Sequence, residues 1–244
     1  VPRELSFYRS HLNYLMNNRL LPESADAWKL MKTLNPKKED YVSYCNFLIA
    51  DGELADAVKV WDEFAGRFGP AAYDRQMGDI IWNGDFELPA ENGGFDWRLG
   101  HAEGVKVFID REVRLTGNAS LRASFDGRSN PDIYVAKQIA PVEPESLYRV
   151  KLSIRTEGIT TLNGVFLDVS GYRCPNLTVR TEPVTGTTNL WKDISTEFVT
   201  TKDCMAVWLG IRREKSDKFD NRISGNVWID SVSMAQAREN KFQK

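Results

Sequence analysis

The sequence lacks most of the residue patterns on which catalysis, membrane insertion and nucleic-acid binding depend. Its only histidines are His11 and His101, and it has no HExxH, GxSxG, Walker or dinucleotide-binding glycine motif, so we expect no enzyme. Its apolar runs are no longer than strands, so no membrane-spanning segment is expected. Its formal net charge of −2 lacks the basic excess that nucleic-acid binding requires.

Cysteine is also scarce, and the spacing of Cys45, Cys174 and Cys204 disfavours a zinc site. Cys174 and Cys204 both fall in the β-rich part and would be able to pair in an exported protein, but three buried or idle thiols are the favoured interpretation. Val1 leads directly into polar and helical residues, so no signal peptide is expected in this stretch. Because the chain begins with Val1 and not with methionine, we expect it to be a processed fragment of a longer protein.

The first part of the chain has apolar residues at helical spacing and an internal repeat. Glu23-Ser-Ala-Asp-Ala-Trp-Lys-Leu aligns with Glu53-Leu-Ala-Asp-Ala-Val-Lys-Val, thirty residues later. The segment resembles a pair of tetratricopeptide-type helical hairpins over residues 5–70, which would continue upstream or dock on the following domain. Trp28 and Trp61 are expected in the helix-packing core, with a peptide-binding groove as the alternative.

The remainder is rich in short segments that alternate or are β-branched, separated by turn residues and with no helix between them. Eight or more such strands predict an antiparallel sandwich. The predicted fold class is therefore α + β multidomain, with helical hairpins followed by a β-sandwich jelly roll. The predicted domains are helical hairpins over 1–70, a linker over 71–81, a sandwich over 82–236 and a polar tail over 237–244.

The second part of the chain contains a series of short motifs that resembles a known protein family. The series includes Asn83-Gly84-Asp85-Phe86-Glu87, Trp97, Gly117-Asn-Ala-Ser-Leu-Arg-Ala, Tyr148-Arg-Val-Lys-Leu-Ser-Ile-Arg155 and the closing Val227-Trp-Ile-Asp230. Their order and spacing resemble a carbohydrate-binding module of the family 4 and 9 type. The resemblance implies a non-catalytic, galactose-binding-like jelly roll that often carries one structural calcium ion. It also implies an extracytoplasmic bacterial protein, either periplasmic or secreted.

Strand order predicts which face of the sandwich would hold a glycan. Successive jelly-roll strands commonly alternate between the two sheets, which places 133–139, 164–172 and 205–212 in one sheet. Alternation along each strand gives this sheet an outward set of aromatic and hydrogen-bonding residues, with a gap at Gly210 where a sugar ring would fit. The predicted glycan-binding residues are Tyr134, Gln138, Asp168, Tyr172, Trp208 and Arg212.

Three alternatives to a glycan face stay open. The outward aromatic residues would be covered by the protein's own loops or helical part, would contact another protein, or would have no binding role. Trp97, Trp191 and Trp228 are expected in the core.

A calcium site is predicted where the first and last strands lie side by side. There Glu87 and Asp230 would supply carboxylates, and Gly117 and Ser120 would add carbonyl oxygens. The alternative is that both carboxylates lie on the surface and Glu87 accepts only backbone hydrogen bonds.

The leading functional hypothesis is non-catalytic binding of a glycan or polysaccharide by a sandwich carried on a helical stem. The rival hypothesis is an interaction scaffold, in which the helical repeats hold a partner protein and the sandwich is a spacer or docking module.

Overall fold

The computed structural model describes residues 4–69 and 79–237 of the chain. The chain divides into two units, residues 1–73 and 74–244, and the fold class expected from the sequence is confirmed in the described parts of both. The predicted linker over 71–81 and the polar tail over 237–244 fall largely outside the described residues.

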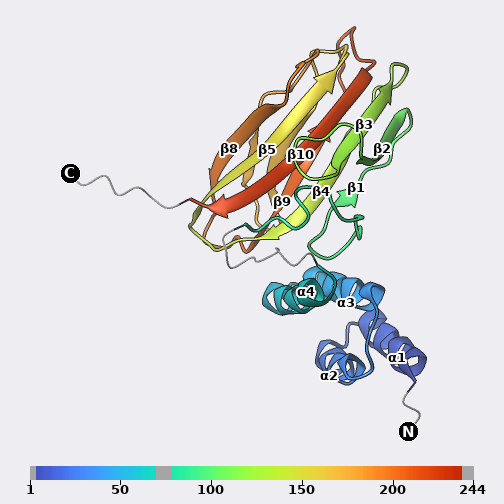
Figure 1. Ribbon diagram of the computed structural model, residues 1–244. Helices are drawn as coiled ribbons and strands as arrows, with labels where there is room; N and C mark the ends of the chain where they lie inside the picture. The colour runs from blue at the N-terminus through green and yellow to red at the C-terminus, as the bar shows by residue number, and fades with distance from the viewer. Residues whose placement is uncertain (1–3, 70–78, 238–244) are drawn as a thin grey trace, which may run out of the picture. The chain divides into compact units, whose positions relative to one another are not determined.

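The first unit consists of two helical hairpins (Figure 1). Their helices are α1 (Leu5–Asn17), α2 (Leu21–Lys32), α3 (Lys38–Asp51) and α4 (Leu54–Phe68). Gly52 ends α3 in the left-handed conformation, with φ of 96°, which glycine adopts without a side-chain clash. No helix within the described ranges is long and apolar enough to cross a membrane.

Aromatic side chains fill the space between these helices. Trp28 stacks on Tyr44 at 4.8 Å and meets the edge of Tyr41 at 5.0 Å, while Trp61 stacks on Phe64 at 4.4 Å. Trp28 and Trp61 are 4% and 1% exposed, so the prediction that they belong to the helix-packing core is confirmed.

The second unit is a sandwich of two five-stranded antiparallel sheets (Figure 1). We call the sheet with strand order β1-β4-β9-β6-β7 sheet A, and the sheet with strand order β2-β3-β10-β5-β8 sheet B. The alternation predicted from Ile133 onward is confirmed, because β4, β6 and β9 lie in sheet A whereas β5 and β8 lie in sheet B. The strands are β1 (Arg98–Leu99), β2 (Val105–Asp110), β3 (Ser120–Asp126), β4 (Ile133–Pro141), β5 (Leu147–Glu157), β6 (Phe166–Gly171), β7 (Thr178–Arg180), β8 (Lys192–Val199), β9 (Ala206–Arg213) and β10 (Ser224–Gln236).

The Asn83–Glu87 stretch closes one edge of the core. The Asn83 side chain exchanges two hydrogen bonds with the backbone of Leu88, and the Asn83 carbonyl accepts one from the indole of Trp97 at 2.9 Å. Phe86 packs on Trp97 at 5.2 Å. A side chain at Gly84 would collide with the carbonyl of Val232, because its Cβ would lie 1.9 Å from that oxygen. Glycine is therefore required where this stretch crosses β10.

Strand β4 contains a β-bulge, which changes which side chains face outward. Tyr134 pairs with Arg212 and Ala136 with Ile211, so Val135 is the extra residue. Beyond the bulge, Lys137 pairs with outward-facing Gly210, while Gln138 pairs with Leu209 of the core. The prediction that Gln138 shares the outer face with Tyr134 is therefore wrong.

The structure also settles how the cysteines are arranged. Cys174 and Cys204 form a disulfide bond, with their Cα atoms 5.1 Å apart, so the interpretation of these two residues as idle thiols is wrong. Cys45 is buried in α3, where its thiol lies 3.6 Å from the Ala57 carbonyl oxygen.

The three sandwich tryptophans that were expected in the core have different positions. Trp97 is fully buried in the core, as predicted. Trp228 is only 3% exposed, but it lies on the outer face of sheet B between the guanidinium groups of Arg122 and Arg155, at 4.9 and 5.6 Å. Trp191 is partly exposed, so its predicted place in the core is wrong.

Candidate functional site

The outer face of sheet A carries a row of side chains that crosses all five strands. The register places Arg98, Lys137, Gly210, Asp168 and Arg180 side by side, one residue from each strand. We call this line the central row. It brings cationic groups to both edges of the sheet, with a glycine and a carboxylate between them.

Tyr134 fills the gap in the central row. A Cβ at Gly210 would lie 2.5 Å from two carbons of the Tyr134 ring, so the ring lies directly over the glycine. The Tyr134 hydroxyl donates a 2.7 Å hydrogen bond to Asp168. Burial, together with this bond, raises the pKa of the tyrosine. The prediction that the gap at Gly210 admits a sugar ring is therefore wrong, because the protein's own side chain occupies it.

The accessible aromatic surface lies beside the central row, at Trp208 and Tyr172. Their rings meet edge to face at 5.9 Å, and each is partly exposed. The Lys137 ammonium lies 4.5 Å from the centre of the Trp208 ring, and the Arg98 guanidinium lies 5.2 Å from it. Arg173 is similarly placed over Tyr172, at 5.6 Å. This aromatic platform, Trp208 and Tyr172, is therefore surrounded by cations.

Asp168 and Arg212 also face outward, but both are engaged within the protein. Asp168 is 7% exposed and accepts the Tyr134 hydroxyl. Arg212 pairs with Asp132 at 3.0 Å and lies 3.4 Å from Glu214, and its guanidinium covers the Tyr134 ring at 4.6 Å. These two residues support Tyr134 and hold the platform's surroundings in place.

Gln138 lies apart from this face. It is fully buried, and its amide bonds both the N–H and the carbonyl of Trp82, at 3.0 and 2.9 Å. The structure therefore brings together five of the six predicted residues and excludes this one. Lys137 and Arg98 were not predicted to face outward here, because nothing in the sequence marks the bulge and β1 has only two residues.

The residues predicted to bind calcium form a clamp on the loop between β2 and β3. Glu87 accepts hydrogen bonds from the backbone N–H groups of Asn118 and Ala119. Asp230 is fully buried and accepts from the N–H groups of Leu115 and Thr116, at 2.8 and 3.1 Å. Both carboxylates therefore hold the same short loop.

The oxygen atoms of this donor set are engaged within the protein. The carboxylate oxygens that a calcium ion would need accept hydrogen bonds from backbone N–H groups. The Ser120 hydroxyl donates to the Val113 carbonyl at 2.6 Å, and the Gly117 carbonyl accepts from Arg114. Within residues 4–69 and 79–237, no three His, Cys, Asp or Glu side chains are grouped as metal ligands. Calcium binding stays a prediction.

A buried carboxyl lies next to β1. Asp96 is fully buried and accepts hydrogen bonds from the backbone N–H groups of Glu91 and Trp97, at 2.6 and 2.7 Å. Burial raises the pKa of Asp96 to about 7. This group therefore changes its charge within the physiological range of pH, beside the strand that carries Arg98.

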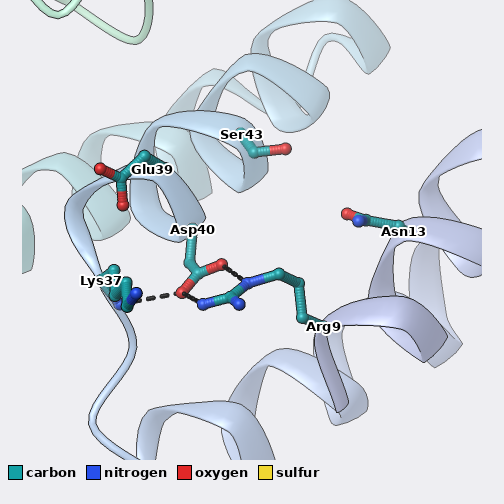
Figure 2. A pocket seen from close by; sticks show the side chains of 6 residues that line it. All are labelled: Arg9, Asn13, Lys37, Glu39, Asp40 and Ser43. Atoms are coloured by element: carbon teal, nitrogen blue, oxygen red, sulfur yellow. Dashed lines mark hydrogen bonds and ion pairs between the residues drawn. The ribbon is translucent and has the colours of Figure 1, made fainter. Parts of the chain in front are cut away.

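The helical unit has a hollow of about 390 Å³ between α1 and α3, shown in Figure 2. Arg9 forms a two-bond ion pair with Asp40, at 2.5 and 2.8 Å. Burial opposes ionisation of Asp40, but hydrogen bonds from Arg9 and from the Lys37 N–H hold its pKa below the usual value. Asn13 and Ser43 also line the hollow (Figure 2).

Comparison with known proteins gives similarity of structure only. No family model and no curated protein matches the sequence, so the tetratricopeptide resemblance stays a prediction. A bacteriophage CBA120 tailspike protein 4 enzymatically active domain is 12% identical with a TM-score of 0.50, over 65% of this chain and 21% of that one. This chain therefore spans about a fifth of that domain.

Two smaller structures resemble the sandwich as well. The CBM22-1 xylan-binding domain of Paenibacillus barcinonensis Xyn10C is 14% identical with a TM-score of 0.46, over 66% of this chain and 96% of that one. TmCBM61, solved with β-1,4-galactotriose, is 18% identical with a TM-score of 0.45, over 65% and 99%. At such identities the likeness concerns the fold alone.

Proposed function

We propose that the sandwich is a non-catalytic carbohydrate-binding module that holds a glycan on the outer face of sheet A. The observation that carries the proposal is the partly exposed Trp208–Tyr172 pair beside the central row. Sugar rings present apolar C–H faces that pack on aromatic rings, and hydroxyl rims that exchange hydrogen bonds with polar side chains. The neighbouring cations supply such donors.

The rest of the face is organised as a rigid support for this pair. Tyr134, Asp168 and Arg212 are bonded to one another or to their neighbours, so the surface beside the pair is already formed without a ligand. A preorganised surface loses less entropy on binding, which matters for a weak, flexible ligand such as a polysaccharide.

The proposal is tested by binding of the whole chain to a panel of soluble polysaccharides, using affinity electrophoresis and calorimetry. Trp208→Ala should weaken binding at least about tenfold, which corresponds to about 1.4 kcal/mol. The matched control is Phe108→Ala, which removes a 41% exposed aromatic ring from sheet B and should leave affinity unchanged. Equal loss in both variants, or binding that neither alters, would refute this location for the site.

Export to an oxidising compartment forms part of the same proposal. It is supported by the disulfide between Cys174 and Cys204, because such bonds persist mainly in secreted and extracytoplasmic proteins. Mass spectrometry of the natural protein under non-reducing conditions would check whether the bond is formed in the cell.

A second candidate function is protein interaction through the helical hairpins, which the hollow between α1 and α3 favours. Replacing Asn13 and Ser43 together with methionine would fill part of the hollow without adding a cation that competes with Arg9 for Asp40. A partner captured by the unmodified chain and by Trp208→Ala, but not by this double variant, would support the scaffold function.

A further inference from the structure

We propose that the ligand of this face is an acidic saccharide, bound through its carboxylate or sulfate group by Lys137 and Arg98 while its ring packs on Trp208. This inference rests on the proposed function and adds the chemical class of the glycan. The supporting observation is the position of Lys137. The bulge in β4 brings this lysine to the outer face, where regular alternation along the strand would not place it.

The first observation is a pair of like charges in register. Arg98 of β1 and Lys137 of β4 are direct cross-strand partners, and like charges opposite one another destabilise a sheet. Both groups are directed over the same ring, at 5.2 and 4.5 Å from its centre. Arg98 is itself engaged, because its guanidinium donates to the backbone carbonyls of Gly94 and Asp96, at 3.0 and 3.3 Å. An anion bound to Lys137 beside it would relieve this repulsion.

The second observation concerns the partners of Lys137. Among the described residues, no carboxylate lies within ion-pair distance of its ammonium, which lies over the rings of Trp208 and Tyr134, at 4.5 and 5.4 Å from their centres. The nearest carboxylate in the central row, Asp168, is bound to the Tyr134 hydroxyl. Lys137 therefore holds a positive charge on the platform that nothing within the described part of the sandwich neutralises.

The third consideration is competition for the face of Trp208. A sugar that stacks on this ring must displace the Lys137 ammonium from it, which forfeits the cation–π contact. A neutral sugar offers the displaced ammonium only hydroxyl groups. A carboxylate or sulfate accepts a charge-assisted hydrogen bond, roughly twice as strong as a neutral one. The same lysine thus disfavours neutral ligands and favours anionic ones.

The whole-chain charge argues against a general attraction for polyanions. The formal net charge is −2, so the field of the protein as a whole does not draw an acidic polymer to it. Preference for an anionic ligand must then come from the local cations around Trp208, and it should depend on individual residues.

The test uses the full chain and a matched pair of ligands, homogalacturonan oligosaccharides before and after methyl esterification. The two share a backbone, but esterification removes the carboxylate charge. Sulfated galactan oligosaccharides provide the sulfate arm, and neutral xylan and galactan oligosaccharides provide the uncharged arm. Affinity is measured by calorimetry at several salt concentrations for the unmodified chain, Lys137→Met, Arg98→Gln, Trp208→Ala and the control Lys106→Met, which alters an exposed lysine of sheet B.

We expect an acidic oligosaccharide to bind at least tenfold more tightly than its neutral counterpart. Lys137→Met should abolish that preference while leaving binding to neutral sugars unchanged or improved, and Arg98→Gln should reduce it. Lys106→Met should have no effect, and Trp208→Ala should remove binding to both classes. If the natural ligand is carboxylated, Lys137→Met should weaken binding of homogalacturonan. If it is sulfated, the same variant should weaken binding of sulfated galactan.

Two other outcomes overturn the inference in different ways. Equal affinity for neutral and acidic sugars, lost in Trp208→Ala but kept in Lys137→Met, would refute the acidic ligand and leave the glycan-binding function standing. Absence of binding to every sugar, or acidic binding that Trp208→Ala does not change, would refute the proposed function of this face together with the inference.

Discussion

Replacing Gly210 with alanine should destabilise the sandwich by displacing Tyr134. The added Cβ would lie 2.5 Å from two carbons of the Tyr134 ring, closer than nonbonded carbon atoms approach. The strand backbone on both sides is fixed by pairing with β4 and β6, so the ring has to move. Its movement would break the 2.7 Å hydrogen bond to Asp168, a carboxylate that is only 7% exposed.

The size of the effect follows from two terms. Overpacking a well-packed site costs about 1–3 kcal/mol, and a hydrogen bond to a charged group contributes about 1.5–3 kcal/mol. The terms overlap, because moving the ring relieves part of the clash, so we expect a loss of about 2–4 kcal/mol. Calorimetric unfolding measures it, with the sandwich transition identified by its shift on reduction of the Cys174–Cys204 bond.

A double-mutant cycle separates this mechanism from a general effect of substituting glycine. In a Tyr134→Ala background the added methyl group has open space, so Gly210→Ala should then cost less than about 0.5 kcal/mol. A cost that is the same in both backgrounds, or a loss below about 0.5 kcal/mol in the unmodified protein, would refute the placement of the Tyr134 ring over the glycine.

Three further predictions concern the rest of the sandwich. The folded pKa of Asp96, about 7, lies above its unfolded value, so the contribution of Asp96 to stability is present at low pH and is lost as pH rises through 7. The melting temperature should therefore fall between pH 5 and pH 8. Asp96→Asn should remove this pH dependence in thermal scans. Reduction of the disulfide, which closes a sequence separation of 30 residues, should cost about 3–4 kcal/mol in urea unfolding. If a calcium ion is bound, EDTA should lower the melting temperature and Asp230→Ala should abolish that response. If Asp230 acts only as a clamp, the variant should lose stability and EDTA should have no effect.

Much of the fold could be predicted because alternation and turn residues are local signals. The division of β4, β6 and β9 from β5 and β8 follows from strand order alone, and the burial of Trp97 was expected from the motif series that contains it. The bulge could not be predicted, because Tyr134-Val135-Ala136 reads as a regular strand without the glycine or proline that often marks an irregularity. That one extra residue exchanges Gln138 for Lys137 on the outer face.

The site was harder to predict than the fold, because it depends on where side chains point between strands distant in the sequence. Alternation of side chains along each strand correctly predicted that Trp208 and Asp168 face outward. The residues that contact them come from other strands and could not be identified in this way. The Tyr134 ring occupies the gap at Gly210 through packing between β4 and β9, which no pattern within either strand indicates. For the same reason the role of Asp230 was open, because its oxygen atoms are satisfied by the backbone of a loop more than a hundred residues earlier in the chain.

The most direct test of a ligand site at Trp208 is an NMR titration that follows the indole N–H resonances, with that of Trp208 assigned by its absence in Trp208→Phe. Addition of galacturonate or sulfated galactan oligosaccharides should shift the Trp208 resonance saturably, and Lys137→Met should weaken the response. A titration that shifts the resonance of Trp191 instead, or that leaves every indole unchanged, would contradict the account.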